Sequence, residues 1–79
     1  MNQDEKLLQM SDEEQILQFF VCGHLPEHLQ KISIPFGEVA LMGIMNVLPR
    51  NPERTVALRK LLESKHAAVR AAIAKQNRP

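Results

Sequence analysis

The short segment LPRNP, residues 48–52, separates two long stretches of helical periodicity and limits what this chain can fold into. Leu48 before Pro49 favours the end of a helix, because the residue preceding a proline is disfavoured in helical geometry. Asn51 is a good N-cap, and Pro52 suits the first position of the next helix. A turn this short forces the flanking helices antiparallel, so the sequence predicts a helical hairpin.

Capping and breaking residues predict where the other helices begin and end. Ser11 and Glu14 form a capping-box pattern, and Gly23 is an ordinary C-terminal signal. Pro35 lies inside the next periodic stretch and predicts a kink or a short break there. The fold class is therefore all-α: a single domain over 1–79, with a tail over 1–10, a short helix over 11–22, a long helix over 26–48 and a long helix over 52–76.

Apolar residues of the second helix cover more than one face. Its main stripe consists of Leu29, Ile32, Phe36, Val39 and Gly43, at helical spacing. Further apolar residues widen this surface beyond what one neighbouring helix can cover, which favours self-association. These are Met42, Met45 and Val47.

The size of the chain favours the same conclusion. A chain of 79 residues has room for a small core only. Its single cysteine, Cys22, cannot form an internal disulfide and is most simply a small buried apolar residue. No cysteine pair and no acidic triplet suggests a structural metal. Oligomerisation is therefore the expected source of additional stability, and we expect a homo-oligomer.

Charge is distributed unevenly along the chain. Residues 1–20 carry a formal charge of −4, whereas residues 49–79 carry +6, in a chain whose net charge is +1. The two ends can pair with each other, or the basic part can remain free for an anion. No stretch has the roughly 20 apolar residues of a membrane span, and the N-terminal residues have no apolar signal region. We therefore expect a soluble, intracellular protein without a membrane partner.

Basic residues of the third helix are candidates for anion binding. Arg59, His66 and Arg70 share one face on a 3.6-residue period. Lys65 falls at the centre of the apolar seam, where it must snorkel, pair with an acid or contact an anion. Arg54, beside Thr55 in the first turn, opposes the helix dipole. It therefore either pairs with an acid or helps to hold a phosphate near the free N–H groups.

Catalytic or metal chemistry has little support in the sequence. The serines lack a nucleophile motif, and no glycine-rich phosphate loop is present. His24 and His28 could bind a metal at i, i+4, but no HExxH pattern accompanies them, and capping, surface or ligand-contact roles are alternatives. We expect no enzyme, no metal and no cofactor. Nucleic acid is an unfavoured partner, because aromatic residues are few and the N-terminal region is acidic.

Two runs of the sequence carry a resemblance to a known family. FFVCGHLPEHLQKISIPFGEVA, followed by LPRNPERTVALRKLLESKHAAVRA, resembles the small phage sponge proteins that defeat CBASS immunity, whose helical hairpin domain is shared with the anti-Thoeris nucleotide sponges. The most specific piece, NPERTVALRKLLE, is similar to the family run Ser-Arg-Glu-x-Ser-Leu-Ala-Leu-Thr-Lys-Leu-Glu-Glu. Here Asn51 stands for the capping serine and Thr55 for the second serine.

The resemblance implies a function and a set of ligand-binding residues. Family members form homo-hexamers that hold cyclic di- and trinucleotides in pockets between protomers without cleaving them. This implies a protein of the host bacterial cytoplasm that blocks CBASS signalling. By position, the aromatic-His-Pro segment of the family implies His24 and Pro26, its basic residues imply Lys31 and Ser33, and a late cation implies Lys75.

Two departures from the family pattern affect base stacking. Cys22 stands where the family often has a tyrosine, and Ala67 stands where it has a tryptophan. Phe20 could replace the lost stacking surface, although packing in the core is the simpler expectation. The rival hypothesis is an interaction module whose basic helix binds an acidic protein partner or nucleic acid.

Overall fold

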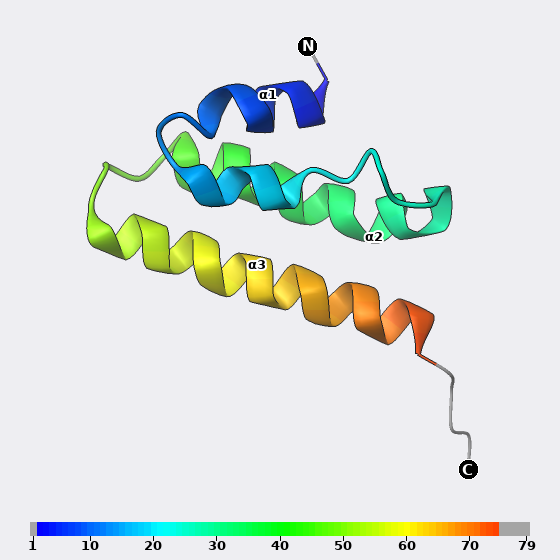
Figure 1. The fold of residues 1–79 in the computed structure, drawn as a ribbon. Coiled ribbons are helices and arrows are strands. Elements are labelled where there is room, and N and C mark those ends of the chain that lie inside the picture. Colours follow the sequence, from blue (N-terminus) through cyan, green and yellow to red (C-terminus); the bar gives the residue numbers. More distant parts are fainter. Residues whose placement is uncertain (1, 75–79) are drawn as a thin grey trace.

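The chain folds from helices alone over residues 2–74, the part that this computed structural model describes, which confirms the predicted all-α class. Figure 1 shows α1 packed over η1 and α2, with α3 running along their opposite side. The elements in chain order are α1 (Gln3–Met10), the 3-10 helix η1 (Gln15–Phe20), α2 (Glu27–Glu38), the π-helix η2 (Val39–Met45) and α3 (Pro52–Ile73).

A capped helix, α1, occupies the N-terminal region that was predicted to be a tail over 1–10. The side chain of Asn2 accepts a hydrogen bond from the backbone N–H of Glu5 at 2.8 Å, and Glu5 accepts one from the N–H of Asn2 at 3.0 Å. Ser11, predicted as an N-cap, is the C-cap of this helix. The capping pattern at Asn2 is formed in place of the predicted one at Ser11, because the helix that begins after Asn2, α1, buries Leu7 completely.

A short 3-10 helix, η1, replaces the α-helix that was predicted over 11–22. Side chains three residues apart lie on the same side of a 3-10 helix. Leu17 and Phe20 therefore both point into the core and are fully buried. Phe19, which lies between them in sequence, is 56% exposed and faces away from the core.

The second helix passes through Pro35 without the predicted break. Pro35 lies inside α2, which continues as far as Glu38. A donor from another helix serves the backbone beside the proline, since the side-chain amide of Gln3 donates to the carbonyl oxygen of Ile34 at 2.9 Å. This contact joins α1 to α2 beside Pro35, whose missing N–H would otherwise have bonded the carbonyl of Lys31.

A π-helix, η2, follows α2 directly. The hydrogen bonds of a π-helix span five residues rather than four, so its turns are wider. In η2 the step of five from Ala40 to Met45 brings both side chains inward. The buried side of α2 consists of Leu29, Ser33 and Gly37, at steps of four residues, so Val39 and Gly43 of the predicted stripe are exposed.

The long helix α3 begins where the sequence predicts. The side chain of Asn51 accepts a hydrogen bond from the N–H of Arg54 at 2.9 Å, and Pro52 is the first helical residue. The helix ends at Ile73, before the predicted end at residue 76. Lys75, a predicted ligand contact, lies outside the described residues.

The core joins α1, η1, η2 and α3. Its buried side chains come from segments far apart in sequence, which ties the N-terminal region to the last helix. Phe36, predicted for the core, packs against it while half-buried. The buried cluster consists of Leu7, Leu17, Phe20, Ala40, Leu41, Met45 and Leu58.

Candidate functional site

A groove between η1, the segment after it and α3 is the best-defined hollow on the described surface. Its volume is about 390 Å³, within the range of small-molecule sites. We call it the η1–α3 groove. Its apolar lining consists of Phe19, Val21, Leu25 and Val69, and its polar lining consists of Gln18, His24, Lys65, His66 and Arg70.

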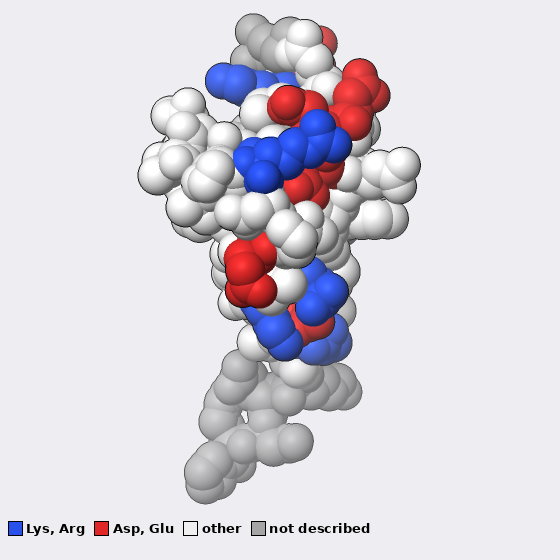
Figure 2. All heavy atoms as spheres, turned by 90° about the vertical axis from the view of Figure 1, so that its left-hand side faces the viewer, with Lys and Arg blue, Asp and Glu red and all other residues white. Residues whose placement is uncertain are grey.

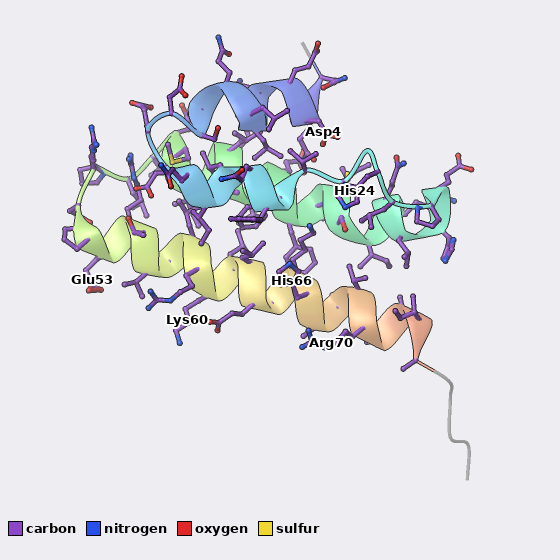
Figure 3. All side chains as sticks on the ribbon, viewed as in Figure 1. Asp4, His24, Glu53, Lys60, His66 and Arg70 are labelled. Carbon is purple, nitrogen blue, oxygen red and sulfur yellow. The ribbon has the colours of Figure 1, made fainter. Side chains whose placement is uncertain are left out.

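Three of the predicted ligand-binding residues meet in the η1–α3 groove. His24 comes from the segment before α2, and Lys65 and Arg70 come from α3. His66, which shares the predicted basic face, also lines the groove. Figure 3 shows His24 on the chain segment between η1 and α2, and His66 and Arg70 on α3. The groove thus combines basic side chains with apolar walls.

The aromatic ring that lines the groove is Phe19, not Phe20. Sequence reasoning considered Phe20 as a base-stacking residue, but that side chain is fully buried in the core. Phe19 is exposed and lines the groove. Residues three apart lie on the same side of a 3-10 helix, so Phe20 points inward with Leu17 and Phe19 does not. Sequence reasoning could distinguish the two phenylalanines only by recognising that this segment is a 3-10 helix rather than an α-helix.

Lys65 connects the two walls of the groove, η1 and α3, by a hydrogen bond. Its side chain is buried in the seam of α3, and Nζ donates a hydrogen bond to the carbonyl oxygen of Phe19 at 2.9 Å. Burial lowers the pKa of the Lys65 ammonium below its ordinary value. The lysine therefore anchors η1 to α3 rather than snorkelling to water.

A carboxylate on α1 fixes the segment that carries His24. Asp4 accepts hydrogen bonds from the backbone N–H groups of Cys22 and Gly23 at 3.1 and 2.7 Å. A Cβ on Gly23 would lie 2.6 Å from Oδ2 of Asp4, so the close approach requires glycine. Cys22 is buried, as expected, and burial raises the pKa of its thiol.

Arg54 and Thr55 do not belong to this groove. Arg54 is buried, with Nε 3.4 Å from a carboxylate oxygen of Glu14, and the Thr55 hydroxyl donates to the same carboxylate at 3.0 Å. Of the two predicted roles for Arg54, pairing with an acid is the one observed. Its position on α3 is eleven residues before Lys65, or about 16 Å along the helix at 1.5 Å per residue.

The remaining predicted residues do not line the groove. Ser33 is fully buried, so its hydroxyl does not reach a ligand at the surface of this chain. Pro26, the residue before α2, is exposed, as is Lys31 on α2. Arg59 is exposed on α3 and does not line the groove.

The basic side chains of α3 point in several directions, whereas the sequence predicted a shared basic face. Arg54 and Lys65 point inward, and Lys60 lies 3.9 Å from Glu63 across one turn. Lys60 and Glu53 point away from η1 and α2 (Figure 3). Figure 2, which shows one end of the molecule, has basic and acidic side chains side by side. On this face, the charges are therefore mixed rather than uniformly basic.

Comparisons of the chain with protein-family models, with curated proteins and with solved structures found no match. Within residues 2–74, no group of three or more His, Cys, Asp or Glu side chains is arranged to hold a metal ion. Over the same range, none of the helices combines the length and the apolar character that crossing a membrane requires.

The ion pair of Arg54 with Glu14 predicts a large effect on stability. Glu14→Ala leaves the Arg54 guanidinium buried without its carboxylate, which is expected to destabilise the fold by about 3–5 kcal/mol. Glu13→Ala is the matched control, because Glu13 is the exposed neighbour. Urea denaturation followed by circular dichroism measures both variants. Equal midpoints for the two variants would show that the ion pair is not structural.

Proposed function

We propose that this protein is a non-enzymatic sponge that sequesters cyclic di- or trinucleotide second messengers and thereby blocks CBASS immune signalling. The observation that carries the proposal is the η1–α3 groove, in which an exposed aromatic ring lies with basic side chains in one hollow. The resemblance of the sequence to the phage sponge proteins supplies the ligand class.

The lining of the groove suits the two parts of a nucleotide. Phe19 is exposed and offers a face for a base, and base–aromatic stacking contributes about 1–3 kcal/mol. Arg70 offers paired N–H donors for a phosphate. His24 and His66 add further donors.

Binding without cleavage fits the kinds of side chain around the groove. Within the described residues, the lining consists of amide, imidazole, ammonium and guanidinium groups and apolar surface, and has neither a carboxylate nor a hydroxyl. A serine, threonine or carboxylate nucleophile would have to come from such groups. The groove is therefore better suited to holding a phosphodiester than to attacking it by that route.

Exposed apolar side chains on the outward side of α2, η2 and the following turn favour a homo-oligomer. Ile34, Val39, Met42 and Val47 are 45%, 48%, 55% and 67% exposed. We propose that copies of the helical hairpin associate through this surface, with a hexamer as the state that the resemblance implies. Symmetric assembly repeats one site, so equivalent cations can contact the equivalent phosphates of a cyclic ligand.

Removing the guanidinium at the rim of the groove is expected to weaken binding. Arg70→Ala should reduce affinity for cyclic dinucleotides or trinucleotides tenfold or more, since a charge-assisted hydrogen bond contributes about 1.5–3 kcal/mol. Lys60→Ala removes the same charge outside the groove and is the control. Isothermal titration measures affinity, and recovery of intact ligand after denaturation tests for cleavage. No heat with any cyclic nucleotide, or recovery of a linear product, would contradict the sponge.

A charge placed in the outward apolar surface is expected to dissociate the oligomer. Met42→Glu would bury a carboxylate at the proposed interface, which is costly unless it is paired. Gln9→Glu adds the same charge at an exposed position of α1 and should leave the mass unchanged. Native mass spectrometry distinguishes them. A single-chain mass for the unmodified protein would contradict the assembly.

A further inference from the structure

A buried cation lies in the wall of the η1–α3 groove without an acid to balance it. Lys65 is only 4% exposed and lines the groove. Its observed hydrogen-bond partner is the neutral carbonyl of Phe19. Among residues 2–74, the ion pairs are those of Arg54 with Glu14 and of Lys60 with Glu63, so no carboxylate in this range pairs with Lys65.

The groups around Lys65 only partly offset its charge. Asp4 of α1 favours the ammonium form through its field. Both carboxylate oxygens of Asp4, however, already accept hydrogen bonds from the backbone of Cys22 and Gly23. Burial raises the pKa of the Cys22 thiol, which disfavours its anionic form beside Lys65. Burial outweighs these contributions and lowers the pKa of Lys65.

Burying a charge is costly unless an opposite charge or several hydrogen bonds balance it. An ammonium group has three N–H donors, and one of them is used on Phe19. An anionic group in the groove would supply the missing counter-charge. The other basic groups around the groove, His24, His66 and Arg70, are exposed and therefore already solvated by water.

We propose that Lys65 is the counter-ion of a phosphate-bearing ligand in the η1–α3 groove and that binding there takes up a proton onto this lysine. The proposal rests on the proposed function for the choice of a nucleotide ligand. It adds that discrimination in favour of anionic ligands comes from a buried lysine, whereas the exposed cations contribute mainly attraction at the rim.

The direction of the pH dependence follows from the charge. The free protein has a lowered pKa at Lys65, and a bound anion raises that pKa. Between the two values, the complex holds a proton that the free protein lacks. Affinity therefore falls as pH rises through this interval, by at most tenfold per pH unit for one proton. Comparison with a variant that changes Lys65 alone separates the proton taken up by Lys65 from any taken up by other groups around the groove.

Isothermal titration at a series of pH values, each in two buffers of different ionisation enthalpy, measures the protons taken up on binding. The probes are adenosine monophosphate and a cyclic dinucleotide, used with the full chain. We expect a net uptake of protons with both probes, because the anion raises the lowered pKa of Lys65. Lys65→Arg, which stays charged throughout, should bind with no uptake. Lys6→Met removes an exposed lysine outside the groove and should retain the uptake.

The outcomes separate this inference from the proposed function. Uptake with adenosine monophosphate, but no binding of cyclic nucleotides, supports the role of Lys65 and overturns the sponge. Binding of the cyclic dinucleotide without uptake, or with uptake that persists in Lys65→Arg, overturns the role of Lys65 and leaves the sponge standing. Failure of both probes to bind overturns both. Lys65→Met, with its fold checked by circular dichroism, should bind more than tenfold more weakly at pH 8 if it folds.

Discussion

The attachment of η1 to α3 is the interaction on which the rest of this structure depends. Leu17 and Phe20 enter the core from one side of the 3-10 helix, and Lys65 bonds the backbone of Phe19 from α3. Together these contacts leave the Phe19 ring exposed beside the last helix. The groove therefore depends on how η1 is attached. The contacts that place Leu17 and Phe20 in the core also place Phe19 in the wall of the groove.

Much of the all-α fold could be predicted from local sequence signals. The N-cap of Asn51 and the first-turn Pro52 act on neighbouring residues, so the start of α3 was predicted correctly. Lys65 was likewise predicted on the buried seam from periodicity alone. The choice between two capping patterns, and the face of α2 that is buried, depend on packing between distant segments. The tail over 1–10 and the buried face through Val39 were therefore predicted wrongly.

The candidate site shows the same division between local and distant information. Lys65 and Arg70 were selected from their positions on one helix, and His24 from the resemblance; the fold brings all three to one groove. Arg54 has the residue type of a phosphate ligand, but its partner, Glu14, lies forty residues away in sequence. No local pattern reveals that pair, and none distinguishes Phe19 from Phe20 until the 3-10 winding of η1 is known.

The central claim is that a nucleotide occupies the groove between η1 and α3. The most direct measurement is the change in backbone amide chemical shifts when a cyclic dinucleotide is added to the isotopically labelled protein. The account predicts the largest changes at Phe19, His66 and Val69, with little change around Glu53 at the start of α3. Changes centred on the start of α3, or no changes at saturating ligand, would contradict it.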